Sequence, residues 1–270
     1  MFAALIQILD SLGDIAVAVS GGVDSMTLSC VAHRAGKRNG ATVRMLHASS
    51  PAVPAEATER VRHVAAVEGW SLSVIDANEF GNAHYRENPV NRCFFCKSQL
   101  YSTIQAQTNV QIVSGANTDD LGEYRPGLDA ARERDVRHPY IEAGIDKAGV
   151  RRIAREMGLE SIADLPSSPC LSSRIETGIR IEAPSLEFVH RVEKLVAAAL
   201  TAATVRCRVR ALSVVIELDD QSLAALTPSI TAHLIAAIKA EGEATGRPLM
   251  GSPPYFAPYK VGSAFLTRQA

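Results

Sequence analysis

The feature that most constrains the fold is a short Ser/Gly-rich turn between a strand-like segment and a helix-like segment. The turn reads S-G-G-V-D-S over residues 20–25, after the apolar run 15–19 and before apolar residues at helical spacing. Glycines let backbone N–H groups crowd around an anion, serine hydroxyls add donors, and a helix N-terminus supplies partial positive charge. The turn therefore predicts a phosphate-binding loop, with an ordinary glycine-rich turn as the alternative.

The spacing of this loop separates it from two common nucleotide-binding motifs. It lacks the G-x-x-x-x-G-K-[ST] pattern of a Walker A loop and the G-x-G-x-x-G pattern of a dinucleotide fold. The pattern S-G-G-x-D-S instead resembles the PP-loop of ATP pyrophosphatases, which split ATP into AMP and pyrophosphate. This resemblance implies that Asp24 helps to hold Mg²⁺ and that ATP contacts the loop through Ser20, Gly21, Gly22, Asp24 and Ser25.

Strand-like and helix-like segments alternate through the first half of the chain. The strand-like runs cover 15–19, 43–47, 71–75 and 110–114, and the helix-like runs cover 25–35, 55–68, 96–107 and 147–157. This alternation predicts an α/β fold with a doubly wound parallel sheet, covered by helices on both faces. Ligands of such sheets bind at the carboxyl ends of the strands.

A stretch rich in Pro and Ser at 165–184 separates this part from the C-terminal part. The C-terminal pattern is helix 186–199, strand 204–209, strand 213–218 and helix 229–241, and we expect the residues after 251 to be irregular. We therefore expect a PP-loop ATP pyrophosphatase domain over 1–170, similar to the adenine nucleotide alpha hydrolases, and a smaller α+β domain over 171–270.

Composition excludes several classes of protein. The chain has 270 residues, 47% of them apolar, which is ample for a core, and its net charge of −1 gives no hint of a nucleic-acid or membrane surface. No apolar run reaches transmembrane length and no basic leader precedes the first segments, so we expect a cytoplasmic protein.

Five cysteines argue against a disulfide framework and for thiol or metal chemistry. We expect Cys30 in the core and Cys207 on the strand face opposite its arginine neighbours.

Three cysteines lie in segments expected to be loops. Cys93 and Cys96 form a single C-x-x-C pair on the loop after the third strand, and Cys170 lies in S-P-C-L-S-S-R. Three thiolates with one open position suit a [4Fe–4S] cluster whose fourth iron binds an exogenous ligand. A redox-active C-x-x-C pair and a zinc site completed by His84 or His138 are the alternatives.

Five segments together resemble the ATP-dependent sacrificial sulfur transferases of the LarE family. Each segment alone is a weak signal for this family, but the order and spacing of the five along the chain make the set specific. They are S-G-G-V-D-S (20–25), N-P-V-N-R-C-F-F-C-K (88–97), G-A-N-T-D-D (115–120), Y-R-P-G (124–127) and P-C-L-S-S-R (169–174).

This resemblance implies a reaction and two sources of sulfur. ATP adenylylates a carboxylate of pyridinium-3,5-biscarboxylic acid mononucleotide, and sulfur then displaces AMP to leave a thiocarboxylate, in the biosynthesis of a nickel-pincer nucleotide cofactor. Either Cys170 gives up its own sulfur and becomes dehydroalanine, or Cys93, Cys96 and Cys170 hold a [4Fe–4S] cluster that carries hydrosulfide. Possession of all three cysteines favours the cluster. Asp24, Cys170 and Arg174 would be the catalytic residues.

The resemblance also implies residues that bind the substrate. Arg206 and Arg208 lie at alternate strand positions and so face the same way, as a clamp on the substrate phosphate requires, and Glu217 matches an acidic site residue. A solvated basic edge strand is the alternative for the two arginines. Arg125 and Arg174 are expected to neutralise phosphates or substrate carboxylates.

Analogy with the fold places the adenine and ribose near Ala48, Ser49 and Gly115. The competing activities are thiolation of tRNA by a PP-loop enzyme and ATP and cluster binding by a sensor without turnover. The near-neutral charge and the lack of a basic or aromatic-rich RNA module count against the first. We expect a homo-oligomer whose partners are the mononucleotide and sulfide or another sulfur donor, and neither a membrane nor a nucleic acid.

Overall fold

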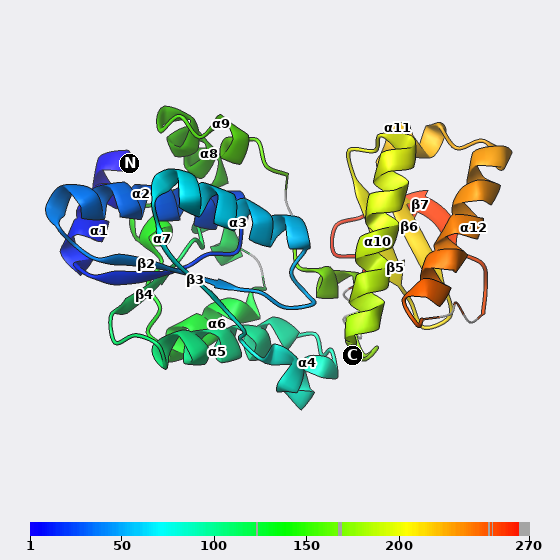
Figure 1. Ribbon diagram of the computed structural model, residues 1–270, viewed down its shortest axis with the longest axis horizontal. Helices are drawn as coiled ribbons and strands as arrows, with labels where there is room; N and C mark the ends of the chain where they lie inside the picture. Colours follow the sequence, from blue (N-terminus) through cyan, green and yellow to red (C-terminus); the bar gives the residue numbers. More distant parts are fainter. Residues whose placement is uncertain (123, 167–168, 248, 250, 265–270) are drawn as a thin grey trace. The chain divides into compact units, whose positions relative to one another are not determined.

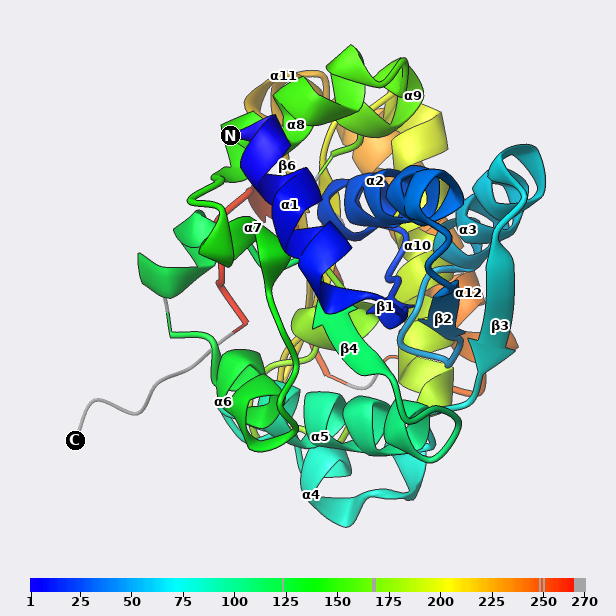
Figure 2. The same cartoon turned by 90° about the vertical axis from the view of Figure 1, so that its left-hand side faces the viewer.

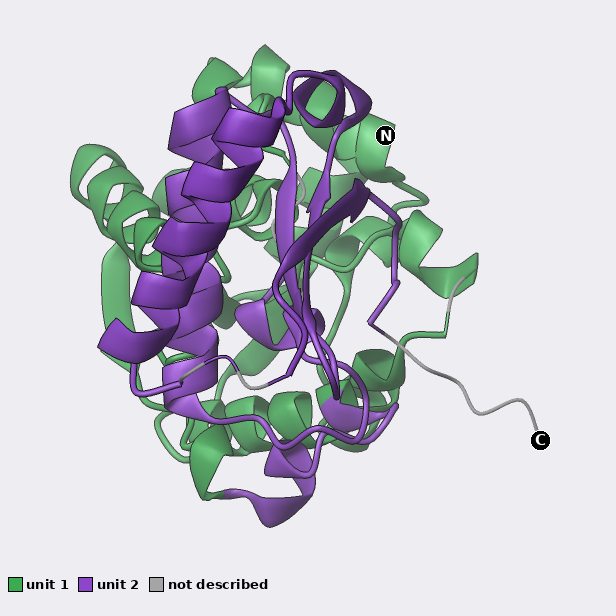
Figure 3. Ribbon diagram, turned by 90° about the vertical axis from the view of Figure 1, so that its right-hand side faces the viewer, with its two compact units in different colours: residues 1–81, 93–168 green, residues 82–92, 169–270 purple. Residues whose placement is uncertain are grey.

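The structure is a computed structural model that describes residues 1–122, 124–166, 169–247, 249 and 251–264. The chain forms two compact units, drawn in different colours in Figure 3: Met1–Gly81 with Cys93–Ser168 (unit 1), and Asn82–Arg92 with Pro169–Ala270 (unit 2). The expected boundary after residue 170 falls close to the division after Ser168. The segment Asn82–Arg92, however, joins unit 2 from the first half of the sequence, so a single boundary does not describe the two units.

Unit 1 is built on the parallel sheet that the sequence predicts. Its four strands run in the order β3-β2-β1-β4 and all neighbouring pairs are parallel. They are β1 (Ile15–Ala18), β2 (Val43–Ala48), β3 (Ser71–Ile75) and β4 (Gln111–Ser114). Because the chain moves outward from β1 to β3 and then returns to the other side of β1, the strand order reverses between β1 and β4, where open α/β sheets bind ligands.

Helices cover both faces of this sheet, as Figures 1 and 2 show. One face carries α1 (Phe2–Leu12), α2 (Val23–Asn39), α3 (Ala55–Glu68) and α8 (Lys147–Glu156), and the other carries α5 (Arg92–Gln105) and α6 (Pro126–Glu133). Shorter segments complete the unit: the 3₁₀ turns η1 (Glu79–Gly81) and η2 (Thr118–Gly122) and the helices α7 (Pro139–Glu142) and α9 (Glu160–Ala163).

The double covering explains why β1 is apolar throughout. Ile15 and Val17 join the core beneath α1, α2 and α8, whereas Ala16 and Ala18 join the core beneath α5. Successive side chains of a strand point to opposite faces, so a strand buried on both faces has no polar alternation. Cys30, on α2, is fully buried in the first of these cores, as predicted.

Unit 2 combines helices with a small mixed sheet. Strand β5 (Val205–Val209) is antiparallel to β6 (Val214–Leu218), and β7 (Tyr255–Pro258) is parallel to β6 on its other side. Helix α10 (Ala183–Leu200) packs along β5, and α12 (Pro228–Ala244) packs on α10; Figure 3 shows the long helices on one side of the strands. The remaining elements are α4 (Ala83–Arg86), the 3₁₀ turn η3 (Leu171–Arg174) and α11 (Asp220–Ala224).

The expectation that the residues after 251 are irregular is wrong, because β7 completes the sheet of unit 2. The strand is four residues long, follows Pro253 and Pro254, and ends at Pro258. Proline within a sheet is confined to edge strands and strand ends, so prolines in a sequence ordinarily argue against a strand. With only four residues, of which the last is a proline, β7 shows no alternation of apolar and polar residues that would predict it. In the part of the chain that the structure describes, no helix is both long and apolar enough to cross a membrane.

Three histidines of unit 1, of which His33 and His47 are buried and His138 is half-buried, are expected to make its stability depend on pH. Burial lowers the pKa of His33, His47 and His138 below the ordinary histidine value. The unfolded chain therefore takes up protons on these rings at a higher pH than the folded chain does. Below about pH 6.5, the ordinary pKa of histidine, the free energy of unfolding should fall as the pH falls.

The measurement is urea unfolding at pH 7.5 and at pH 5.5. His47→Gln should reduce the difference between the two pH values, because it removes one of the three rings. The exposed His63 lies on α3, and His63→Gln should leave the difference unchanged. A stability that rises on acidification over this range would contradict the expectation.

Candidate functional site

The S-G-G-V-D-S turn follows β1 and is cross-braced by its own serines. The Ser25 hydroxyl accepts a hydrogen bond from the Ser20 amide at 3.0 Å, lies 3.0 Å from the Ser20 hydroxyl and donates to the Gly22 carbonyl at 3.2 Å. Gly21 has a left-handed φ of 84°, and Gly22 is the N-cap of α2. The first amides of α2 therefore lie at the turn without intrahelical partners, as an anion-binding loop requires.

The loop after β4 approaches this turn more closely than any side chain would allow. A Cβ atom on Gly115 would lie 2.8 Å from the backbone nitrogen of Ser25 and 2.9 Å from the carbonyl carbon of Asp24. Because these atoms belong to the helix backbone, they do not move aside as a flexible side chain would. The structure thus brings the predicted residue Gly115 onto the first turn of α2.

Asp24 lies at the centre of a polar cluster. Its carboxylate forms an ion pair with Lys147 and accepts a hydrogen bond from the Asn117 side chain at 3.2 Å, and its backbone carbonyl accepts from the Tyr140 hydroxyl at 3.2 Å. Lys147 is the first residue of α8, which the side chain of Asp146 caps. The sequence pattern indicates no role for Lys147, because a lysine at a helix start is ordinarily a solvated charge.

Arg125 joins the same cluster through Asp120. Its guanidinium lies 3.2 Å from one Asp120 carboxylate oxygen, and the other oxygen accepts a hydrogen bond from the Asn117 amide at 3.0 Å. Asp119 accepts from the Lys147 amide at 3.3 Å. The segment 115–120 and the predicted Arg125 are therefore connected to the Ser/Gly turn by an unbroken series of contacts.

The C-x-x-C pair was expected on a loop, but it lies on the first turn of α5. Cys93 and Cys96 are separated by three positions and so share one side of this helix; both are half-buried. A Cβ atom on Gly127 would lie 3.2 Å from Cγ of Lys97 and 3.9 Å from the carbonyl oxygen of Cys93. The start of α6, next to Arg125, therefore packs directly on the turn that carries the two cysteines.

Cys170 belongs to unit 2 and is exposed at the start of η3. The buried Arg174 holds the backbone around it, donating to the carbonyls of Pro169 at 2.7 Å and Cys170 at 3.2 Å. Glu193 on α10 in turn binds this guanidinium through two hydrogen bonds of 2.9 and 3.0 Å. Arg174 thus fixes the segment that presents the Cys170 sulfur to solvent.

Thiolate sulfur is a suitable ligand for iron or zinc, so Cys93, Cys96 and Cys170 fit such a site by donor type. Among the described residues, no group of three or more His, Cys, Asp or Glu side chains is gathered as a metal site. His84 and His138, the alternative zinc ligands, have other neighbours: His138 lies 2.9 Å from the Ser114 hydroxyl and His84 lies 3.7 Å from Glu87. The cluster and the zinc site both stay predictions.

Arg208 and Glu217 form a buried ion pair in unit 2. They are 4% and 3% exposed, and Nε of Arg208 lies 2.8 Å from the Glu217 carboxylate. The other guanidinium nitrogens of Arg208 donate to the carbonyls of Ser173 and Lys260, both at 3.1 Å. This arginine therefore joins β5 to β6, to the Cys170 segment and to the last described residues.

Arg206 is also on β5, and its guanidinium lies 5.7 Å from the centre of the Tyr259 ring. Burial lowers its pKa below the ordinary arginine value. Arg210 lies 3.2 Å from Glu176 and 3.9 Å from Glu217, contacts that the sequence pattern does not indicate. The structure thus brings the predicted residues of unit 2 together in one charged cluster, while Cys207 between them is fully buried. Their role in binding phosphate stays a prediction.

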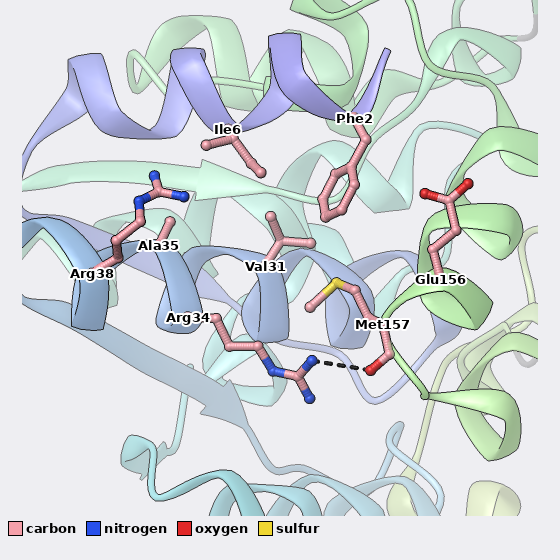
Figure 4. A pocket seen from close by; sticks show the side chains of 8 residues that line it. All are labelled: Phe2, Ile6, Val31, Arg34, Ala35, Arg38, Glu156 and Met157. Atoms are coloured by element: carbon pink, nitrogen blue, oxygen red, sulfur yellow. Dashed lines mark hydrogen bonds between the residues drawn. The ribbon is translucent and has the colours of Figure 1, made fainter.

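The predicted adenine contacts lie at the end of β2. Ala48 is its last residue, and the Ser49 amide donates to the Ile75 carbonyl at 2.9 Å. A cavity of about 270 Å³ lies elsewhere in unit 1, between α1, α2 and α8 (Figure 4). Arg34 at its rim bonds to the Met157 carbonyl and to Glu68. None of the predicted site residues lines this cavity, so the candidate site is the polar cluster at the strand ends.

The open parallel sheet and its cross-braced turn define unit 1 as an α/β unit of the PP-loop type. No model of a known protein family matches the chain. An uncharacterized protein of Synechocystis sp. is 38% identical over 191 residues, covering 69% of this chain and 70% of that protein. The pyridinium-3,5-bisthiocarboxylic acid mononucleotide synthase of Lactiplantibacillus plantarum is 28% identical over 197 residues, covering 71% and 70%.

A third relative is an uncharacterized protein of Methanocaldococcus jannaschii, 28% identical over 143 residues, which cover 48% of this chain and 54% of that protein. The chain belongs to the family of the Synechocystis protein, and its similarity to the named synthase supports the LarE family that the motifs indicate.

The contact between Gly115 and the start of α2 gives a matched pair of variants. Gly115→Ala should push the loop after β4 away from Ser25. The pyrophosphate release from ATP that the motif predicts should then fall by roughly tenfold or more, because misplacing positioning groups is costly. Gly122 is the last residue of η2, and a Cβ atom added to it would have no neighbouring atom within 4 Å. Gly122→Ala should therefore react like the wild type. Equal activity of the two variants would show that the close contact has no part in the reaction.

Proposed function

We propose that this chain is an ATP-dependent sulfur transferase of the LarE type. It would adenylylate the carboxylates of pyridinium-3,5-biscarboxylic acid mononucleotide and convert them to thiocarboxylates, in the biosynthesis of a nickel-pincer nucleotide cofactor. The observation that carries the proposal is the cross-braced turn of residues 20–25 packed against Gly115. The synthase named for the thiocarboxylate product, 28% identical to this chain, supports the same activity.

The first step would take place at the turn of unit 1. A carboxylate oxygen of the substrate attacks the α-phosphorus of ATP, and pyrophosphate leaves with the electron pair of the broken P–O bond. The amides at the start of α2 and the serine hydroxyls would stabilise the charge on the leaving pyrophosphate. Asp24 would hold Mg²⁺, and the ammonium group of Lys147, now paired with Asp24, would then be available to a phosphate oxygen.

Adenylylation has a clear chemical purpose in this scheme. A carboxylate is a poor electrophile, whereas the mixed anhydride with AMP carries a good leaving group. Sulfur attacks its acyl carbon and AMP departs, which leaves a thiocarboxylate. The charged cluster of unit 2, with Arg206, Arg208 and Glu217, would bind the phosphate of the mononucleotide.

The sulfur would come from one of two sources. A [4Fe–4S] cluster held by Cys93, Cys96 and Cys170 would present hydrosulfide at its fourth iron when bound. The alternative is the exposed thiol of Cys170, which would displace AMP to form a thioester. Removal of the Cα proton by a base and cleavage of the Cβ–Sγ bond would then release the thiocarboxylate and leave dehydroalanine. We propose the cluster form because the chain has all three cysteines.

The carboxylate of Asp24 is the sharpest test of the first step. Asp24→Ala should lower mononucleotide-dependent pyrophosphate release by roughly 100-fold or more, since electrostatic stabilisation of a leaving group is often of this size. Asp10 is a surface aspartate on α1 that pairs with Arg38, and Asp10→Ala should keep wild-type activity. Pyrophosphate is measured with and without substrate, and with unmodified tRNA instead. Sulfur transfer to tRNA would show that the protein is a tRNA thiolation enzyme instead. ATP binding without turnover would show that it is a sensor.

The source of sulfur is tested by mass spectrometry of the Cys170 peptide after reaction. A cluster predicts about four irons per chain in anaerobic protein, loss of iron in each of the three cysteine variants, and repeated turnover with sulfide. A sacrificial Cys170 predicts one turnover per chain and conversion of this residue to dehydroalanine, with Cys93→Ala and Cys96→Ala still active once. Dehydroalanine at Cys170 in cluster-loaded protein would contradict the cluster form.

A further inference from the structure

The first two turns of α3 pack on the Ser/Gly turn at Gly21, whereas Gly115 packs on it at Asp24 and Ser25. A Cβ atom on Gly21 would lie 2.9 Å from the carbonyl oxygen of Ala57 and 3.1 Å from its Cβ atom, so α3 packs directly on the turn. Arg60, one helical turn after Ala57, donates a hydrogen bond from Nη1 to the carbonyl oxygen of Gly21 at 2.8 Å.

A second contact of α3 fixes the end of β1. His47 lies 2.8 Å from the Val19 carbonyl through Nδ1 and 2.8 Å from the Thr58 hydroxyl through Nε2. A carbonyl only accepts hydrogen bonds, so Nδ1 donates to it and Nε2 accepts from the hydroxyl. Helix α3 is therefore held against the strand end independently of Arg60, and we expect the helix to stay in place when the Arg60 side chain is removed.

The bond from Arg60 sets the direction of one peptide group. In a trans peptide the C=O and the N–H point to opposite sides. Because the Gly21 carbonyl points to Arg60, the Gly22 N–H points away from it. Glycine accepts backbone conformations on both sides of φ = 0, and Gly21 itself has a φ of 84°, so this Gly–Gly peptide has little intrinsic preference against rotation. Rotation would replace the N–H, a donor for an anion, by a carbonyl oxygen that repels one.

We propose that Arg60 is a positioning residue of the anion loop, which holds the Gly21–Gly22 peptide so that the Gly22 N–H is presented to the pyrophosphate part of a nucleotide. The inference rests on the proposed use of this turn for ATP and names a residue that acts on it. A guanidinium suits the task because it stays charged, and a charged donor makes a stronger bond to a carbonyl than a neutral donor does. The helix supplies the support and the arginine selects the orientation.

The test compares Arg60→Gln and Arg60→Lys with Arg62→Gln in the full chain. Arg62 is exposed on the same helix, so this control removes the same charge two residues away. Calorimetric titration with Mg·ATP, inorganic pyrophosphate and AMP should show roughly tenfold weaker binding of the first two to Arg60→Gln. AMP lacks the pyrophosphate, and its affinity should stay unchanged. Arg60→Lys should fall between Arg60→Gln and the wild type, and Arg62→Gln should match the wild type.

A second measurement reports on the peptide itself. In protein labelled with ¹⁵N-glycine, the Gly22 amide resonance should shift on addition of pyrophosphate in the wild type and much less in Arg60→Gln. Equal weakening of ATP and AMP together with a lower melting temperature would mean that Arg60 only supports the fold, and the inference would fail. Unchanged pyrophosphate binding in Arg60→Gln would overturn it as well.

The outcomes also separate this inference from the proposed function. If the wild type binds neither ATP nor pyrophosphate, the proposed function fails and the inference fails with it. If the wild type binds both and Arg60→Gln binds them equally well, only the inference on Arg60 fails.

Discussion

The site of unit 1 depends on one close approach, that of Gly115 to the first turn of α2. With the backbone of Ser25 and Asp24 less than 3 Å from where a Cβ atom would lie, only glycine fits there. This contact joins the loops after β1 and β4, the two strands between which the strand order reverses. Asn117 then reaches Asp24, and Asp120 reaches Arg125, because the segment that carries them starts at this glycine.

Charged groups organise both units, but with different consequences. In unit 1 the pair of Asp24 and Lys147 is partly exposed, and in the proposed reaction a magnesium ion or a phosphate would compete for these partners. In unit 2 the pair of Arg208 with Glu217 is buried, and the buried Arg174 pairs with Glu193, whose side chain is 13% exposed. Removing one partner of a buried pair typically costs about 3–5 kcal/mol, because the other charge is left without compensation. The partly exposed pair would therefore exchange partners during the proposed reaction, whereas the pairs of unit 2 fix backbone segments, including the one that carries Cys170.

The sequence predicted the parallel sheet well, because its strands are buried on both faces and read as short apolar runs between helical patterns. It also predicted the turn between β1 and α2. It failed for β7, whose four residues pair at a sheet edge between prolines and have no pattern of their own. The predicted helix began only at Cys96, whereas α5 begins at Arg92, so the C-x-x-C pair was placed on a loop. Lys147 and Arg60 were missed for another reason. Lys147 contacts the carboxylate of Asp24 and Arg60 contacts the backbone carbonyl of Gly21, and both partners are distant in the sequence, so spacing along the chain does not predict these contacts.

Burial alone divides the five cysteines into two groups. Cys30 and Cys207 are fully buried, and burial raises the pKa of Cys30 to about 12 and that of Cys207 further. Both therefore stay protonated near neutral pH, and the thiolate is the form that attacks carbon or binds metal. Cys93, Cys96 and Cys170 are half-buried or exposed, on segments held by helix α5 or by the buried Arg174. The two buried thiols therefore contribute to the cores, and the accessible cysteines are the three that the proposed cluster uses, of which the sacrificial alternative uses Cys170 alone.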